Sequence, residues 1–191
     1  MTDLPPLQPL LDVAVDVARR AGALLLEGAG DVRTTVETKS TRTDMVTEMD
    51  RASERLVVSA LREARPGDGV LGEEGSASGG TSGVRWVVDP LDGTTNYLYG
   101  FPAWAVSVAA EVDGRSVVGV VHDAVHDETF TALRGGGAWC NGVPLTVTGA
   151  PDLATALVGT GFSYDAGERA VQAARLSRVL PVVRDIRRAG A

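Results

Sequence analysis

The sequence predicts an α+β fold in which helices pack in layers against a sheet. Two helical patterns come first, apolar strands joined by tight turns follow, and a further helical pattern lies near the carboxyl end. Helices and strands that occupy separate stretches of a chain are typical of layered α+β domains. The 191 residues, of which 44% are hydrophobic, are enough to build a sizeable core.

The first two segments have the pattern of amphipathic helices. In the first, apolar residues recur at steps of three and four, namely Leu10, Leu11, Ala14, Val17, Ala18, Ala21, Leu24 and Leu25. Gly28 and Gly30 are expected to stop this helix. The apolar side of the second consists of Met49, Ala52, Leu56, Ala60 and Leu61. Arg65-Pro66-Gly67 is expected to end it, and Thr47 with Asp50 resembles a capping pair at its start.

Short apolar runs then predict strands, at Val70-Leu71, Trp86-Val87-Val88, Trp104 to Val112, Ser116 to His122 and Glu128 to Leu133. Asp113-Gly114 and Asn141-Gly142 are hairpin-turn dipeptides, which imply antiparallel pairing. The glycine-rich stretch 79–83 is expected to be a loop. A further helix is expected from Gly167 to Leu180, closed by Pro181.

Composition narrows the class of protein. The formal charge of −7 argues against a nucleic-acid-binding surface, which usually needs clustered basic residues. No apolar run is long enough for a membrane span, and the amino terminus lacks a signal-peptide pattern. Cys140 is the only cysteine, so no intrachain disulfide can form. Together these features favour a soluble cytoplasmic protein without a membrane partner.

The strongest local signal is the motif from Trp86 to Asn96. An apolar strand delivers Asp89 at its end, and Pro90 is expected to prevent the strand from continuing. The chain must then turn, so that Asp89 and Asp92 can converge with the Leu91 carbonyl between them. These hard oxygen ligands suit Mg²⁺ or Mn²⁺. Acidic groups in one pocket repel each other and phosphate alike unless cations lie between them.

Other features of the acidic motifs have both a functional and a structural interpretation. The amides of Gly93 and Thr94 can open a short helix that receives a phosphate oxygen, although the motif can also be a capped turn without a ligand. Gly72-Glu73-Glu74-Gly75 follows a strand and can be an ordinary solvated loop. Asp44 and Asp50 can equally cap a helix and complement its dipole.

Taken together, these motifs resemble the inositol monophosphatase family in order and approximate spacing. The resemblance rests on Lys39, the run Thr43 to Asp50, Gly72-Glu73-Glu74 and Trp86 to Asn96. Phe101-Pro102, Gly119-Val120-Val121, Gly135 to Ala138, Cys140-Asn141-Gly142 and Ile186-Arg187 extend it over nearly the whole chain.

The resemblance implies a metal site of several ions. Glu73, Asp89 and the carbonyl of Leu91 would hold the first metal. Asp89 and Asp92 would help to hold a second, and Glu73 a more weakly bound third. The ion implied is Mg²⁺, with Mn²⁺ as an alternative, and no organic cofactor is implied. Glu73 therefore belongs to the catalytic set as well as to the ligands.

The remaining implied roles concern water and phosphate. Asp50 and Thr94 would orient and help to activate the attacking water, and Asp92, Gly93 and Thr94 would hold the phosphate group. Lys39 is the only lysine, at the lysine position of the family, among seventeen arginines. A compact ammonium suits an acid-crowded site better than a planar guanidinium does, although a single lysine can also fall there by chance.

The implied function is a Mg²⁺-dependent phosphomonoesterase that attacks inositol monophosphate, or a similar small phosphate monoester, with metal-activated water. Metals lower the pKa of bound water and stabilise charge on the phosphoryl oxygens. The resemblance also implies lithium sensitivity and a homodimer.

Two other phosphatase mechanisms, the cysteinyl-phosphate type and the haloacid-dehalogenase type, fit poorly. Cys140 precedes no phosphate-binding loop that ends in arginine, and Asp89 and Asp92 are three residues apart rather than two. His122 and His126 are interpreted as structural or surface residues.

The resemblance implies a layered α/β/α/β/α sandwich whose second domain is truncated. Residues 1–150 would form an α+β domain with the antiparallel sheet and the metal site, and residues 151–191 the start of a second α/β domain. A later Trp-Asp motif, which in the family contributes to the second metal and to substrate contacts, is absent. A non-catalytic remnant that binds metal or a partner is therefore an alternative. Histidinol phosphate, fructose bisphosphate and 3′-phosphoadenosine nucleotides are alternative substrates.

Overall fold

The computed structural model describes the backbone of residues 5–34, 42–73, 77–147, 149 and 152–190, with side chains except at 30–34 and 42–47. The chain divides into two compact units, one ending at Leu145 and the other covering Thr146–Gly190. No helix in the described part of the chain combines the length and the hydropathy that a membrane span requires.

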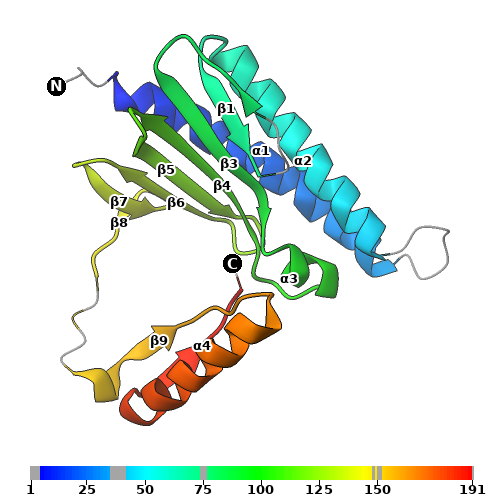
Figure 1. Cartoon of the computed structure of the whole chain (residues 1–191). Coiled ribbons are helices and arrows are strands. Elements are labelled where there is room, and N and C mark those ends of the chain that lie inside the picture. Colours follow the sequence, from blue (N-terminus) through cyan, green and yellow to red (C-terminus); the bar gives the residue numbers. More distant parts are fainter. Residues whose placement is uncertain (1–4, 35–41, 74–76, 148, 150–151, 191) are drawn as a thin grey trace. The chain divides into compact units, whose positions relative to one another are not determined.

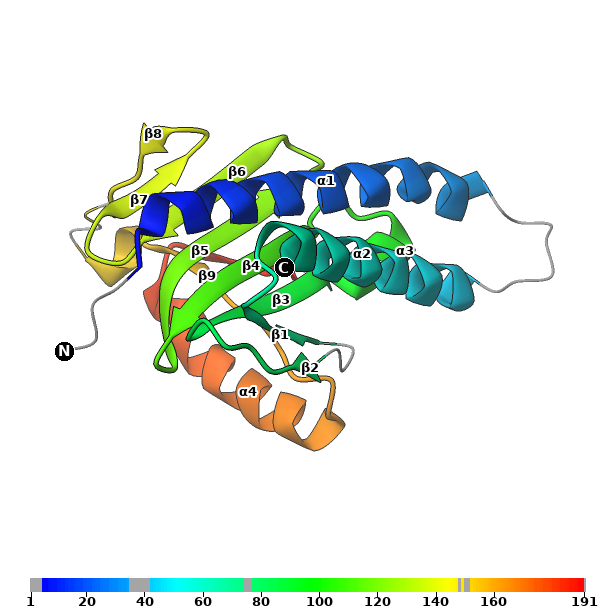
Figure 2. The ribbon, with the colours of Figure 1, turned by 90° about the horizontal axis from the view of Figure 1, so that it is seen from above.

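In the first unit, two long helices lie side by side on one face of a sheet (Figures 1 and 2). They are α1 (Leu7–Thr34) and α2 (Arg42–Ala64). Helix α1 packs over the strands that span residues 105–112, 115–123 and 128–133, and α2 packs over those that span residues 84–92 and 69–72. All the predicted apolar residues of the first helix except Leu24 are buried, in one core with the inward strand residues. Each fully buried leucine stabilises this layer by about 1.5–3 kcal/mol.

The sheet has eight strands in the order β2-β1-β3-β4-β5-β6-β7-β8. Their bounds are Gly69–Gly72 (β1), Ala77–Ser78 (β2), Val84–Asp92 (β3), Ala105–Val112 (β4), Arg115–Asp123 (β5), Glu128–Leu133 (β6), Gly137–Cys140 (β7) and Val143–Pro144 (β8). Strands β1 and β3 are parallel, and the other neighbouring strands are antiparallel. The two predicted hairpin turns are confirmed, because Asp113-Gly114 and Asn141-Gly142 have the positive φ angles of such turns.

The first helix does not stop at Gly28 or Gly30, as the sequence had predicted, but continues to Thr34. The reason lies in tertiary packing. A Cβ atom at Gly28 would lie 2.4 Å from Met49 Cε and 3.0 Å from Tyr97 Oη. Gly28 therefore allows α1 to approach α2 and the segment around Tyr97 closely, and it is not a helix terminator here.

Two further predictions, on the start of α2 and on the end of β3, were wrong. Helix α2 begins at Arg42, so Thr47 and Asp50 lie inside it and are not a capping pair at its start. Strand β3 does not end at Pro90 but continues to Asp92, with a shift in its pairing to β4 between Asp89 and Asp92. A bulge of this kind accommodates a proline because the ladder hydrogen bond is interrupted there.

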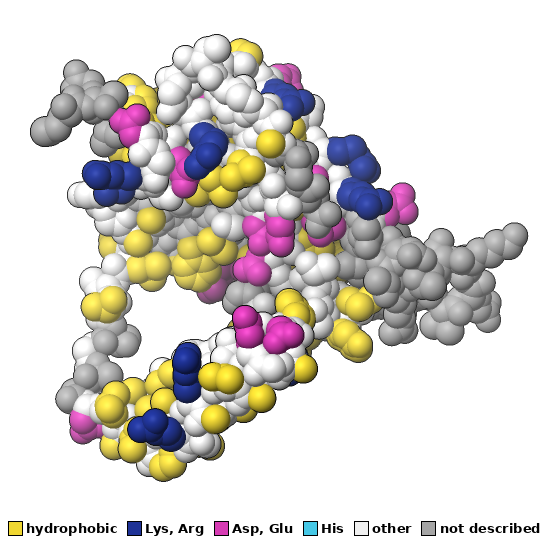
Figure 3. Space-filling model, viewed as in Figure 1, with side chains coloured by type: hydrophobic (Ala, Val, Ile, Leu, Met, Phe, Trp, Pro, Cys, Tyr) yellow, Lys and Arg dark blue, Asp and Glu magenta, His cyan; other side chains and the backbone are white. Residues whose placement is uncertain are grey.

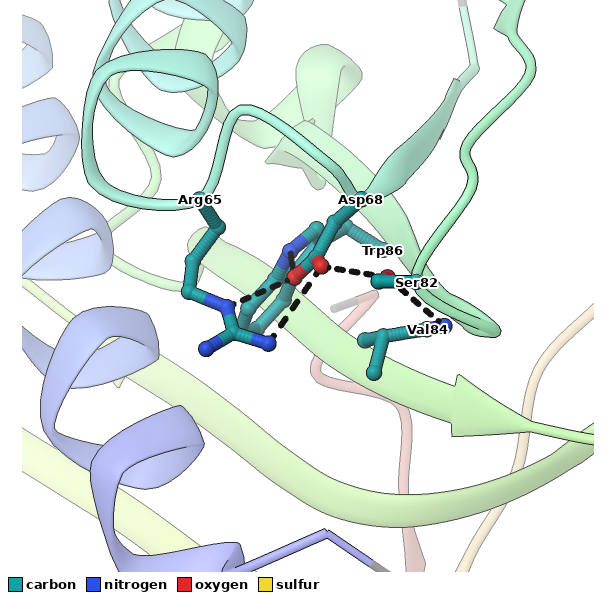
Figure 4. A network of polar contacts seen from close by, with 5 residues as sticks. All are labelled: Arg65, Asp68, Ser82, Val84 and Trp86. Atoms are coloured by element: carbon teal, nitrogen blue, oxygen red, sulfur yellow. Dashed lines mark hydrogen bonds and ion pairs between the residues drawn. The ribbon is translucent and has the colours of Figure 1, made fainter.

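A buried carboxylate just before β1 joins the end of α2 to β3 (Figure 4). Asp68 accepts hydrogen bonds from Trp86 Nε1 (3.0 Å), Ser82 Oγ (2.6 Å), and Arg65 Nε (2.9 Å) and Nη2 (3.3 Å). The Ser82 hydroxyl also accepts the amide of Val84. A buried carboxylate with this many donors is compensated for its lost hydration. This network fixes the strand β1 relative to β3.

The second unit contains the predicted helix, α4 (Ala166–Val179), followed by the short helix η2 (Leu180–Val182) that includes Pro181. Asp165 begins α4 as an N-cap, because its Oδ1 accepts the amide of Glu168 at 2.8 Å. The other elements are η1 (Leu153–Thr155), β9 (Leu157–Gly159) and β10 (Asp185–Arg187). Strands β9 and β10 pair in parallel.

Candidate active site

The carboxyl ends of β1 and β3 bring two acidic residues together. These strands run parallel, and Gly72 pairs with Val88, so Glu73 and Asp89 are the next residues along their chains. Parallel strands end at the same edge of a sheet, which places the two carboxylates side by side. A slip of one residue in this register would turn one side chain to the opposite face. The register therefore determines the site.

The bulge in β3 gives this edge its second aspartate. Asp89 pairs with Ser107 and Asp92 with Ala105, so the two residues between the aspartates lie outside the regular ladder. Asp89 Oδ1 accepts the amide of Leu91 at 3.1 Å, which stabilises the local turn. The Leu91 side chain is buried and anchors the bulge in the core.

The three carboxylates influence each other electrostatically. Burial raises the pKa of Asp89 from 3.8 to about 7, and the negative charge of Glu73, its hydrogen bond to Asp89 and the charge of Asp92 act in the same direction. The pKa of Asp92 is also raised, first by burial and then by the charge of Glu73, while the amide of Gly93 opposes this rise. Carboxylates that are hard to ionise together are stabilised by a cation placed between them.

The short helix α3 (Thr94–Tyr99) starts directly after the acidic bulge. Its first flanking residue, Gly93, has φ 87° and ψ 34°, a left-handed conformation that favours glycine. Thr94 Oγ1 donates to the Leu91 carbonyl at 3.0 Å. The Leu91 carbonyl therefore accepts a hydrogen bond from the first residue of α3, and its role as a metal ligand stays a prediction. The roles of Gly93 and Thr94 in phosphate binding stay predictions.

Contacts with α1 and with residues 103–104 hold helix α3 in place. Tyr97 Oη donates to the Leu25 carbonyl of α1 at 2.7 Å, and the Tyr97 ring meets Trp104 edge to face at a centroid distance of 5.2 Å. Asn96 Nδ2 donates to the Ala103 carbonyl at 2.6 Å. These contacts fix the turn that carries Gly93 and Thr94 without involving either residue.

Helix α2 approaches the same edge from the helix layer. It packs against both β3 and α3, and its residue Asp50 is half-buried inside the helix. One turn away, the fully buried Ser53 donates its Oγ to the Pro90 carbonyl at 2.9 Å. Ser53 was not among the site residues predicted from the sequence. A serine on the apolar face of a helix, three residues after a candidate catalytic aspartate, was the signal that could have revealed it.

Some predicted site residues lie outside the described part of the chain. Lys39 and Glu74 are among them, and the side chain of Asp44 is also not described. Within the described residues, no three His, Cys, Asp or Glu side chains converge tightly enough to form a ready metal cage. The neighbouring carboxylates Glu73, Asp89 and Asp92 nevertheless have the oxygen donors that Mg²⁺ and Mn²⁺ prefer, so the donor set fits such an ion.

The surface around the site is hollowed and partly apolar. A cavity of about 390 Å³ includes Glu73 and Asp89 in its wall; its other lining residues are Leu71, Gly72, Val87, Val88, Ser107 and Ala109. Figure 3 shows acidic side chains gathered near the carboxyl end of β3, with hydrophobic side chains beside them on the sheet. The site therefore combines a charged edge with an apolar wall.

The two histidines have structural surroundings, as the sequence predicted. His122 is buried, and its Nδ1 lies 3.1 Å from Thr129 Oγ1, which also accepts Arg19 Nε at 3.1 Å. Burial lowers the pKa of His122. His126 is at the surface, where its Nδ1 lies 2.7 Å from Asp123 Oδ2. Neither contact involves the acidic edge.

The sequence profile of the inositol monophosphatase family matches residues 6–191, and this match agrees with the acidic edge described above. The chain belongs to the inositol monophosphatase family. An inositol-1-monophosphatase of Mycobacterium leprae is 48% identical over 172 residues, which are 85% of this chain and 58% of that protein. A Nus factor SuhB of Pseudomonas aeruginosa is 44% identical over 161 residues, which are 83% of this chain and 59% of that protein.

Solved structures of the family agree with the fold. SuhB of Mycobacterium tuberculosis superposes with a TM-score of 0.84 at 39% identity, over 99% of this chain and 71% of that one. SuhB of Bartonella henselae gives a TM-score of 0.84 at 36% identity, over 95% and 70%. The predicted α+β sandwich of this family is thereby confirmed. The chain spans about six-tenths of the length of the two curated relatives described above.

Proposed function

We propose that this chain carries the metal-binding and water-activating part of a phosphatase that hydrolyses inositol monophosphate or a similar small phosphate monoester. The observation that supports this most directly is the interaction of Glu73 with Asp89, which directly follow the last paired residues of two parallel strands, with Asp92 close enough to raise the pKa of Asp89. Carboxylates held together against their repulsion are common at functional sites.

Each residue has a proposed task. Glu73, Asp89, Asp92 and the Leu91 carbonyl would hold Mg²⁺, or Mn²⁺ in its place. The ion, when bound, would neutralise the phosphate charge and make water a usable nucleophile near neutral pH. Asp50 would accept the proton of that water.

The phosphate contacts would come from the turn after the bulge. Thr94 would orient the water with Asp50, and the amides of Gly93 and Thr94 would bind phosphate oxygens beside Asp92. The left-handed conformation of Gly93 and the Thr94 hydrogen bond to Leu91 give this turn a fixed shape.

We also propose a cytoplasmic location, since a lone cysteine suits a reducing compartment. We further propose that the protein forms homodimers, which light scattering would detect.

The test is phosphate release by the purified chain with and without Mg²⁺. Inositol monophosphate would be compared with histidinol phosphate, fructose bisphosphate and a 3′-phosphoadenosine nucleotide. We expect Mg²⁺-dependent release that is greatest with inositol monophosphate and absent after Asp89→Asn. Metal binding without release of phosphate from any of the four substrates would refute the proposal and support a non-catalytic role.

A further inference from the structure

Ser53 makes a buried polar contact that apolar packing does not require. Its side chain is fully buried on the face of α2 that meets the sheet, and its Oγ donates to the Pro90 carbonyl at 2.9 Å. A hydroxyl in such an interface is unfavourable unless it is hydrogen-bonded. The Pro90 carbonyl lies in the bulge, outside the regular pairing of β3 with β4. Each group therefore satisfies the other.

The two ends of this hydrogen bond belong to different parts of the candidate site. Ser53 lies three residues after Asp50, and residues three apart share a face of a helix. Pro90 lies directly between Asp89 and Leu91. The bond thus joins the turn of α2 that contains the proposed base to the bulge that contains the proposed metal ligands, over 37 residues of sequence.

We propose that Ser53 is a positioning residue that fixes the distance and angle between Asp50 and the ligand-bearing bulge. This inference rests on the proposed metal site and on the proposed role of Asp50. Burial of Val57 and Leu61 holds α2 on the sheet, but hydrophobic attraction has no direction. A hydrogen bond prefers one distance and one angle, so it fixes how the helix is rotated and shifted. A displacement of about 1 Å in a catalytic group can cost on the order of a hundredfold in rate.

The experiment compares three variants of the full chain. Ser53→Ala removes the hydroxyl, and Ser53→Thr keeps it. Ser59→Ala makes the same change at an exposed position of the same helix and is the matched control. Turnover and KM for inositol monophosphate are measured with Mg²⁺, and affinity for Mn²⁺ is measured by calorimetry. Melting is followed to confirm that each variant is folded.

We expect Ser53→Ala to lower kcat by about ten- to a hundredfold, with KM and Mn²⁺ affinity within about threefold of the parent. Metal affinity should persist because Glu73, Asp89, Asp92 and the Leu91 carbonyl all lie in the sheet edge. Ser53→Thr should recover most of the turnover, and Ser59→Ala should leave it unchanged. A kcat within about twofold of the parent in folded Ser53→Ala would overturn the inference.

A second readout does not depend on activity. Bound Mn²⁺ speeds the relaxation of nearby amide protons steeply with distance. In Ser53→Ala we expect the enhancement at residues 49–51 of α2 to change relative to that at residues 86–88 of β3. An unchanged ratio overturns the inference whatever the activity. A parent chain that binds Mn²⁺ but releases no phosphate instead refutes the proposed function, and the ratio then decides the positioning role alone.

Discussion

Replacing Asp89 by asparagine removes the carboxyl group that interacts with both other acids of the site. In the folded chain, burial and the nearby charges of Glu73 and Asp92 raise the pKa of Asp89 from 3.8 to about 7. The unfolded chain therefore releases this proton at lower pH than the folded chain does. The stability that follows from the raised pKa is fully present below pH 3.8 and is lost as the pH rises through about 7.

The size of this effect follows from the shift in pKa. A difference of about three pH units corresponds to about 4 kcal/mol. Asp89 is only half-buried, so solvent screening reduces the expected cost to on the order of 1–2 kcal/mol. An asparagine carries no charge at any of these pH values, and its oxygen can still accept the amide of Leu91. Asp89→Asn should therefore stabilise the metal-free chain at pH 8 by about 1–2 kcal/mol and change little at pH 4.

The assay is chemical denaturation at pH 4 and pH 8, with chelator or with Mg²⁺. Mg²⁺ at a hundred times its dissociation constant should stabilise the parent by about 2.7 kcal/mol and should stabilise Asp89→Asn far less. Glu63→Gln, which removes an exposed charge from α2, is the control and should follow the parent. The reasoning is wrong if Asp89→Asn is less stable than the parent at pH 8 without metal, or if Mg²⁺ stabilises both equally.

Other perturbations test other parts of the molecule. Asp50→Asn and Thr94→Ala should each lower turnover at least about a hundredfold while melting stays near that of the parent; the double variant should lose little more than either single one, and unchanged turnover would make Asp50 merely structural. His122→Gln should reduce the dependence of melting on pH below 6.5, because a lowered histidine pKa gives stability that is lost as pH falls below that value; circular dichroism at pH 5 and 7 measures this. Asp68→Ala should destabilise the chain by about 3–5 kcal/mol in urea without changing Mg²⁺ affinity, because it leaves Arg65 and Trp86 without their shared acceptor. Lithium should inhibit phosphate release while Mg²⁺ dependence persists, and release that is indifferent to lithium contradicts the lithium sensitivity that the resemblance implies.

The parts of the fold that sequence predicted well depend on local signals. The hairpins around Asp113-Gly114 and Asn141-Gly142 were predicted because those dipeptides accept positive φ angles. The buried side of α1 followed from its period alone. In both cases the residues that determine the turn or the buried side lie next to each other in the sequence, so no knowledge of the tertiary structure was needed.

The errors came where distant residues decide the local structure. Glycine commonly ends helices, which is why Gly28 was predicted to stop α1. Its actual role depends on Met49 and Tyr97, which lie far away in sequence. Asp50 has the pattern of a cap, yet α2 extends eight residues before it. The position of Ser53 on the apolar face of α2 is visible in the sequence, but its partner, the Pro90 carbonyl, lies 37 residues away and required the tertiary structure. The acidic motifs were found because strand ends and carboxylates leave a sequence pattern, whereas the pairing of Glu73 with Asp89 required the sheet register.

The parallel pairing of β1 with β3 also bears on the order of folding. All the proposed metal ligands lie within residues 73–92, and the pairing of β1 with β3, which residues 73–83 connect by way of β2, brings them together. Short loops close quickly and at low entropic cost. The carboxylates can thus assemble before α2, which carries Asp50, docks on the sheet. A divalent ion present during refolding should then favour an early state that contains this strand pair, and so accelerate folding as well as stabilise its product.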